Sequence, residues 1–405
     1  MYDFEKSGCP EALVETGAEI VVVGKDNLFT SDQGTNDRII SECPNALENG
    51  RKTNFTLNID GVDYITQLEQ QKLGTVSHRH VIPTDHMLVQ WTNMQPEANQ
   101  VLAPADGFIV EAEGLKGDFR FILELSCNEY LSLGHLDKFA GSASQLENEF
   151  GEGHRRIQTR IPVKAGDVIA LTGEIMSDLW YWDQTKKIDG VREANYFTHN
   201  GMNLHAVDIF DYLKDDVSVG ISKKIIGSAD SFHGQIGWNE NGNLQGDWYE
   251  LDTFGEHGPL ASWLDHIDIY SQNFFGPWDG ALSFSPNAFD PKTYLISVGS
   301  FDSKGSIVGV TKNNQSPLDL KPGMQPVALE LYDFTYLGDS GKTFDKDNWL
   351  GRTYSDRLQT TPTETKLGVI VLQLVDDKTL KVEKRPGESA NNNPNFVGEP
   401  IIYKR

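Results

Sequence analysis

Short runs in which apolar and polar residues alternate dominate the chain, and Gly, Pro, Asn or Asp separates most of them. A period of two predicts β-strands joined by tight turns. Residues 101–110 read as a strand, a Pro-Ala-Asp-Gly turn and a second strand, and residues 161–170 repeat this order. Strands are also predicted at 119–125 and 130–136, whereas the polar stretches 141–160 and 174–200 are expected to be surface insertions. The pattern predicts a folded β-sandwich within residues 76–215.

Residues 220–405 carry a second series of alternating runs. Asn241-Gly242 lies between the aromatic runs 232–238 and 244–249, and an Asn-Gly pair in this position predicts a hairpin. Further strands are predicted at 282–284, 293–298, 306–311, 327–334, 367–375 and 378–384. Because no helix period separates them, we expect an antiparallel β-barrel or sandwich, with a lipocalin-like barrel as one form.

An amino-terminal arm completes the predicted organisation. Residues 1–75 contain a β-branched run at 19–23, a long polar stretch and a hairpin expected to turn near Asp60-Gly61. The predicted fold class is therefore mainly β. It consists of an arm with a hairpin at 1–75, a β domain at 76–215 and an antiparallel β domain at 220–405.

The charge of the chain narrows the range of partners. Its 405 residues include 35 Lys and Arg against 59 Asp and Glu, which gives a formal net charge of −24. A charge of this sign repels nucleic-acid phosphates and anionic lipid headgroups, so neither is an expected partner. No apolar run approaches the ~20 residues of a membrane helix, so membrane insertion is not expected either.

The same acidic, Asn- and Gly-rich composition favours an extracellular or cell-envelope protein. No leader peptide is visible at the start, so the chain either begins after a cleaved leader or is cytoplasmic. Cys9 and Cys43 lie in similar settings and would close the arm as a disulfide in an exported protein. In a cytosolic protein, they and Cys127 are expected to be free thiols.

Four histidines have neighbours that suggest chemistry. His80 and His86 flank Pro83-Thr84-Asp85, His135 lies in Gly-His-Leu-Asp, and His205 lies in Asn-Leu-His-Ala-Val-Asp. A zinc site needs three or four nitrogen, oxygen or sulfur ligands, and a catalytic site leaves one position for water. On a strand, His80 and His86 share one face, whereas Asp85 faces the other way unless Pro83 breaks the pleat.

The order of these motifs resembles that of the lysostaphin-type zinc endopeptidases, also called LytM-like peptidases. In that family a His-x-x-x-Asp motif precedes an Ala-Pro-x-x-Gly hairpin, followed by His-Leu, a Gly-Asp-x-Ile-x-x-x-Gly turn and His-x-His. The matching segments here are Val101–Gly107, Gly134-His135-Leu136, Val163–Gly173 and Asn203-Leu204-His205. The similarity covers residues 76–213, about a third of the chain.

The resemblance implies a zinc site. His205 would match the last histidine of His-x-His, His80 the first motif's histidine, and Asp85 or His86 the ligand aspartate. His135 would match the histidine that polarises the scissile carbonyl or stabilises the oxyanion, and a zinc-bound water would be the nucleophile.

The sequence departs from the family pattern at three places. The first motif has one extra residue, Asn203 replaces the first histidine of His-x-His, and an insertion follows Gly173. Asparagine cannot take a proton from the attacking water. Two hypotheses follow. One is a divergent zinc-peptidase-like protein that hydrolyses an extracellular or envelope peptide, and the other is a non-catalytic binding or structural protein on a degenerate peptidase scaffold.

Overall fold

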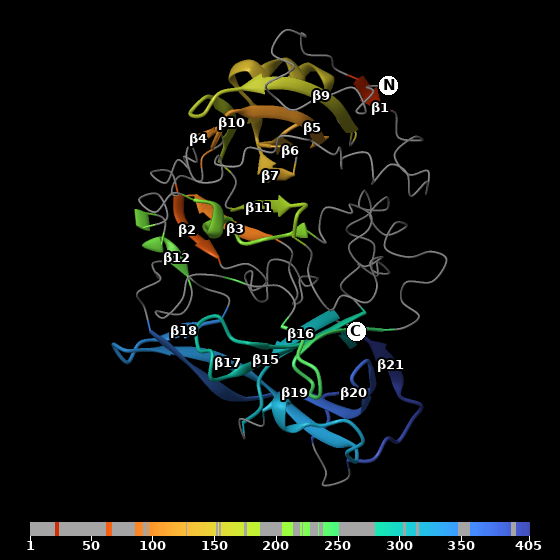
Figure 1. Cartoon of the computed structure of the whole chain (residues 1–405). Coiled ribbons are helices and arrows are strands. Elements are labelled where there is room, and N and C mark those ends of the chain that lie inside the picture. The colour runs from red at the N-terminus through yellow and green to blue at the C-terminus, as the bar shows by residue number, and fades with distance from the viewer. Residues whose placement is uncertain are drawn as a thin grey trace. The chain divides into compact units, whose positions relative to one another are not determined.

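The computed structural model is mainly β, as predicted, and its strands pair in antiparallel sheets (Figure 1). It describes residues 21–23, 62–66, 86–91, 95, 97–126, 128–150, 153, 155–173, 176–186, 205–213, 219–220, 222–226, 234, 238–250, 280–302, 305–312, 316–346, 357–389 and 394–405. These residues belong to two compact units, with unit 1 ending at Ile225 and unit 2 running from Ile226 to Arg405. No helix in the described part of the chain is long and apolar enough to cross a bilayer.

A nine-stranded sheet forms most of unit 1, in the order β1-β9-β5-β6-β7-β11-β3-β2-β12. Its strands are β1 (Val21–Val23), β2 (Val62–Thr66), β3 (Met87–Trp91), β5 (Gly107–Leu115), β6 (Asp118–Glu124), β7 (Glu129–Leu136), β9 (Arg155–Val163), β11 (Met176–Asp183) and β12 (Ile225–Ile226). The strands predicted at 101–110, 119–125, 130–136 and 161–170 are confirmed. The first strand of the hairpin predicted in the arm lies outside the described residues.

A smaller layer covers one face of this sheet. It contains the three-stranded sheet β4 (Asn99–Leu102), β10 (Val168–Thr172) and β8 (Lys138–Phe139), together with the 3₁₀-helix η6 (Gly141–Glu149). The ring of Phe119 on β6 lies 5.1 Å from that of Phe139 and 4.8 Å from that of Phe150. The core of unit 1 therefore lies between the two layers.

The alternation of side chains explains which face is covered. A row of buried apolar residues crosses six neighbouring strands, because the register aligns them: Ile157, Ala112, Phe121, Leu133, Leu179 and Met87. The opposite face carries Arg156, Glu113 and Arg120 in one row and Trp182, Tyr130 and Glu124 in another. One face of the sheet is thus apolar and the other polar and aromatic.

The polar face is held together by ion pairs. Arg160 donates to both carboxylate oxygens of Glu124, at 3.2 and 2.9 Å, and its guanidinium lies 4.2 Å from the ring centre of Phe108. Burial raises the pKa of Glu124, although the bonds from Arg160 act in the opposite direction. A buried pair of this kind fixes the strands that carry it, because either charge left alone would be costly.

Two predicted surface insertions of unit 1 are wrong in part. Residues 155–160 form the first two thirds of β9, and η6 buries Ala143 and Leu146. Residues 176–183 form β11, which pairs with both β7 and β3 inside the sheet. The charges of these segments suggested a solvated surface. However, their alternate residues pack on the apolar face, and most charges on the other face are paired.

Unit 2 contains a second nine-stranded sheet, in the order β16-β15-β14-β13-β21-β20-β19-β17-β18. Its strands are β13 (Gly246–Glu250), β14 (Ala281–Pro286), β15 (Tyr294–Asp302), β16 (Gly305–Gly309), β17 (Val327–Gly338), β18 (Thr343–Asp345), β19 (Leu358–Asp376), β20 (Thr379–Pro386) and β21 (Ile401–Lys404). The predicted antiparallel character is confirmed, but neither sheet is closed into a barrel by its ladders. An isolated bridge between Val310 and Tyr332 brings the chain next to β16 against β17, so the sheet curls strongly.

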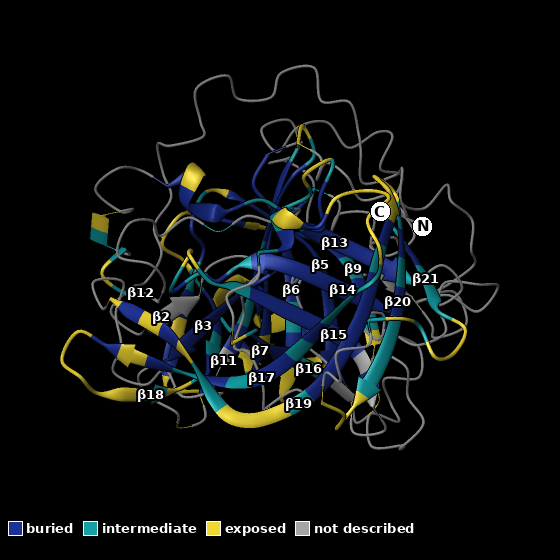
Figure 2. Cartoon of the chain, turned by 90° about the horizontal axis from the view of Figure 1, so that it is seen from below, coloured by how far each residue is buried: buried dark blue, intermediate teal, exposed yellow. Residues whose placement is uncertain are grey.

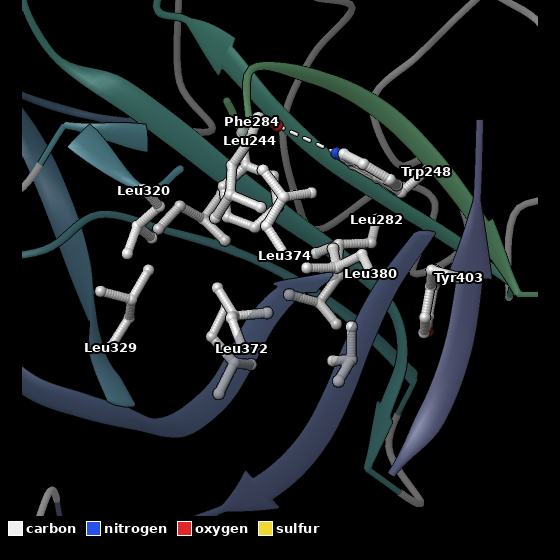
Figure 3. Packing of buried hydrophobic residues seen from close by; sticks show 14 of the residues in the cluster. Leu244, Trp248, Leu282, Phe284, Leu320, Leu329, Leu372, Leu374, Leu380 and Tyr403 are labelled. Carbon is white, nitrogen blue, oxygen red and sulfur yellow. Dashed lines mark hydrogen bonds between the residues drawn. The ribbon is translucent and has the colours of Figure 1, made fainter. Parts of the chain in front are cut away.

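The interior of unit 2 is filled by side chains (Figure 3). Its buried cluster is Leu244, Trp248, Leu282, Phe284, Ile296, Val298, Phe301, Leu320, Leu329, Leu331, Ile370, Leu372, Leu374, Leu380, Val382 and Tyr403. Buried residues follow most of these strands, whereas the middle of β19 carries an exposed stretch (Figure 2). The alternating runs predicted from residue 282 onward are all strands in the structure.

The hairpin predicted around Asn241-Gly242 is not formed by the described residues. Asn241 and Gly242 do form a turn, but β13, which follows it, pairs with β14 and β21. The turn is tied to the rest of unit 2 by Arg405, which donates to the carbonyl oxygens of Glu240, Asn243 and Gln245. The Asn-Gly pair thus predicted the turn correctly, but it did not predict which strands pair with β13.

Candidate functional site

Two of the predicted histidines meet at one end of the unit 1 sheet, where they share a carboxylate. His86 Nε2 lies 3.6 Å from Asp178 Oδ1, and His135 Nε2 lies 3.4 Å from Asp178 Oδ2. His135 Nδ1 lies 3.1 Å from Asp118 Oδ1. We call His86, Asp118, His135 and Asp178 the His135 cluster.

Neighbouring strands bring these four residues together. Asp118 begins β6, His135 is next to last in β7, Asp178 lies in β11, and His86 directly precedes β3. The order β6-β7-β11-β3 in the sheet places them side by side, with Asp178 paired in register with Leu88. The cluster therefore depends on strand order, since Asp118 and Asp178 are 60 positions apart in the sequence.

His135 has an unusual backbone. Its φ is 57°, in the left-handed region that few residues other than glycine adopt. Its carbonyl oxygen accepts hydrogen bonds from Thr172 Oγ1 at 3.1 Å and from Ser177 Oγ at 3.4 Å, and Trp91 Nε1 donates to the same Ser177 oxygen. These contacts hold the backbone in a conformation that costs free energy, so the position of the ring is fixed by its surroundings.

The two carboxylates decide the charge of His135. Its side chain is 50% exposed, whereas that of Asp178 is 15% exposed. The hydrogen bond with Asp118, followed by the one with Asp178, raises the pKa of His135 from 6.5 to about 10, against the effect of burial. At neutral pH the ring is therefore an imidazolium, with each ring nitrogen donating to a different carboxylate.

Trp180 occupies the space beside the cluster. Its ring centre lies 4.7 Å from that of His86, and the guanidinium carbon of Arg120 lies 5.5 Å from the indole. Arg120 is in turn paired with Glu113. The indole stands two residues after Asp178 on the same face of β11, so an aromatic ring fills the position next to His86.

His205 lies elsewhere in unit 1. Its Nδ1 contacts the carbonyl oxygen of Lys186, and its neighbour Ala206 forms a bridge with Trp182. Trp182 is four residues from Asp178 along β11, which corresponds to roughly 13 Å. The structure therefore joins His86 and His135 through Asp178 and leaves His205 at the other end of that strand. The predicted site residues His80, Asp85 and Asn203, and the three cysteines, lie outside the described residues.

The described donors do not fit a zinc ion as they stand. No group of three or more His, Cys, Asp or Glu side chains converges on a metal position within the described ranges. A histidine ligand must present an unprotonated nitrogen, and both nitrogens of His135 are engaged by carboxylates. The arrangement can hold a positive charge between two strands, and it leaves His135 no nitrogen with which to accept a proton.

The sequence did not identify Asp118, Asp178 or Trp180 as site residues. Residues 177–183 read Ser-Asp-Leu-Trp-Tyr-Trp-Asp, in which Leu179 and Tyr181 alternate with polar or large aromatic residues. This period of two was the available signal for a strand with one polar face. Asp118 carries no such signal, since it begins a strand after a Lys-Gly turn.

Comparison with known proteins adds no assignment. No protein-family model matches the chain, and no curated protein matches it with significant similarity. The functional argument therefore depends on the geometry of the site and on the motifs of the sequence.

Proposed function

We propose that unit 1 is a non-catalytic binding domain on a scaffold of the lysostaphin-peptidase type, with an extracellular or envelope peptide as its ligand. The observation that carries this proposal is the engagement of both His135 nitrogens by carboxylates. With both nitrogens directed at carboxylates, His135 has no N–H left to polarise a scissile carbonyl, which is the role that the resemblance gives it. The ligand class and compartment rest on the motif resemblance and on the acidic composition.

The side chains that β11 presents to His86 and His135 also support a domain without catalytic activity. In the resembled family, His-x-His follows the Gly-Asp turn. In this chain the strand that follows Gly173 and contacts both His86 and His135 is β11, which presents Asp178 and Trp180 at positions i and i+2. This alignment differs from the match of the motif to Asn203-Leu204-His205, and on it the two histidines are replaced by an aspartate and a tryptophan. An indole provides no metal-binding lone pair.

The finer fold of unit 2 is part of the same proposal. Strands β13 to β16 form one meander and β17, β19, β20 and β21 form a second, with β18 at the edge beside β17, and β21 pairs with β13. The bridge from Val310 to Tyr332 links the two ends of this series. This order and the single enclosed core support a lipocalin-like architecture with a filled interior.

The proposal is tested by measuring peptide binding, peptide cleavage and zinc content on the same full-length protein. A pool of synthetic peptides is incubated with the protein and analysed by mass spectrometry, and zinc per chain is determined by elemental analysis. We expect a subset of peptides to bind, no cleavage above background and zinc well below one ion per chain.

A matched pair of double variants sharpens the test. Asp178→His/Trp180→His restores two histidines beside His86 and should raise zinc to about one ion per chain. Thr361→His/Thr363→His introduces the same i, i+2 pair on β19, with no histidine beside it among the described residues, and should not. The competing zinc-peptidase hypothesis gains instead if the wild type holds one zinc that His80→Ala/His205→Ala removes, or if it cleaves peptides. Absence of any peptide binding would also contradict the proposal.

A further inference from the structure

The resembled peptidases place a metal ion among histidines and a carboxylate, and the described residues here do not fit one. They instead place a single cationic ring between two carboxylates. Asp118 on β6 and Asp178 on β11 lie on either side of His135 on β7, at 3.1 and 3.4 Å from its two nitrogens. The three side chains form a bridge across three adjacent strands.

We infer that the cation of this site is the proton carried by His135, and that this proton holds β6, β7 and β11 together. The inference concerns the ionisation of unit 1 and does not depend on whether the domain binds a peptide. It makes His135 a positioning residue for the strands.

The surroundings of His135 favour this arrangement on every side that the structure describes. Asp118 and Asp178 supply the negative charges, and His86 contacts the carboxylate oxygen of Asp178 that does not face His135. Thr172 of β10 and Ser177 of β11 hold the carbonyl oxygen of His135 and offer the ring no charge. Among the nearby cations, Arg120 is paired with Glu113 and Lys138 with Glu97. The two aspartates are therefore the groups that set the charge of the ring.

A metal ion would have to displace this proton and take over Asp178. Protons and metal ions compete for the same imidazole nitrogen, so a histidine that holds its proton into the alkaline range binds metal weakly at neutral pH. The indole of Trp180 also lies 4.7 Å from the ring centre of His86 and offers a metal ion no ligand atom. Two features therefore disfavour zinc binding: the proton that His135 retains and the indole of Trp180 beside His86.

The experiment is a pH titration of the histidine Cε1–H signals by NMR on the full chain, with His135→Asn to identify the signal of His135. Asparagine is the chosen replacement because it tolerates the left-handed backbone better than most residues. We expect the His135 signal to titrate with a pKa of about 10. Asp118→Asn and Asp178→Asn should each lower this value by about one unit or more, because each removes one charge partner.

Two results would overturn the inference. One is a wild-type His135 that titrates near 6.5, the ordinary value. The other is stoichiometric binding of added zinc at pH 7 that shifts the His135 signal. Glu97→Gln serves as the control, since Glu97 is paired with Lys138 and not with His135, and it should leave the titration unchanged. If His135→Asn fails to fold, the signal of His135 is identified as the one that shifts in both Asp118→Asn and Asp178→Asn, because both aspartates contact this ring.

Discussion

Replacing Arg405 with alanine should destabilise unit 2 by about 4 kcal/mol. The guanidinium of Arg405 donates to four carbonyl oxygens, those of Asp377, Gln245, Glu240 and Asn243, at distances of 2.8, 2.7, 2.7 and 3.1 Å. Its central carbon lies 4.2 Å from the ring centre of Trp248. Arg405 is 6% exposed and Trp248 is fully buried, so water screens these contacts little.

The magnitude follows from these contacts. A desolvated cation over an indole contributes roughly 2 kcal/mol. The four carbonyl oxygens lose a charged donor, and if water reaches half of them, the two that remain unpaired cost about 1 kcal/mol each. The sum is about 4 kcal/mol, which corresponds to a fall of roughly 8 to 16 °C in the melting temperature for a unit of this size.

Urea unfolding and hydrogen exchange measured by mass spectrometry would check this prediction. Exchange should accelerate most in β13, β20 and β21, because Arg405 joins the segment before β13 to the turn between β20 and its neighbour β19. Arg405→Lys should give an intermediate loss, since lysine keeps the charge but not the planar fork. The exposed Arg357 provides a control, and Arg357→Ala should change stability by less than ~0.5 kcal/mol. A loss below about 1 kcal/mol for Arg405→Ala, or an equal loss in the control, would refute the reasoning.

Three further predictions concern other parts of the chain. Gly368→Ala should destabilise unit 2 by roughly 2 kcal/mol or more in urea unfolding, because φ is 146° and a Cβ would lie 2.6 Å from a backbone oxygen; an unchanged midpoint would contradict this. Arg160→Met should lower the free energy of unfolding by about 3–5 kcal/mol, because it leaves the Glu124 charge unpaired, and the double variant with Glu124→Leu should recover part of that loss in urea unfolding. Equal losses in the single and the double variant would contradict this reason. Because folding raises the pKa of His135 from 6.5 to about 10, its stabilising contribution is complete below 6.5 and is lost as pH rises through 10. Stability measured against pH should therefore fall more steeply in the alkaline range for the wild type than for His135→Asn.

The strand pattern of this protein could be predicted from its sequence. Alternation placed Phe121 and Leu133 on one face of their strands, and turn residues such as Asp106 marked where strands end. The turn at residues 164–167 shows the local cause, since Asp167 Oδ2 accepts a hydrogen bond from the backbone N–H of Lys164, three residues earlier. Period and turn chemistry act over a few residues, so they can be recognised without knowledge of the fold.

The error at residues 174–200 shows where this reasoning stops. The run around Asp178 and Trp180 alternates like a strand, but its charged and bulky polar-face residues suggested an exposed insertion. In the sheet, Asp178 faces His135 and Trp180 faces His86, so these side chains have partners from other strands. Whether a charged residue is exposed or paired depends on neighbours that the local sequence does not contain.

The sequence by itself thus determined the class of fold, the positions of most strands and the motifs that resemble a zinc peptidase. Tertiary structure decided which strands are neighbours, and through them the chemistry of His135 and the anchoring of Arg405. Arg405 and Asn243 lie 162 positions apart, yet their contact helps to join β13 and β21. The physical reason is that strand periodicity is set by local backbone geometry, whereas charge state, pairing and register depend on contacts between distant segments that exist only after the sheet has formed.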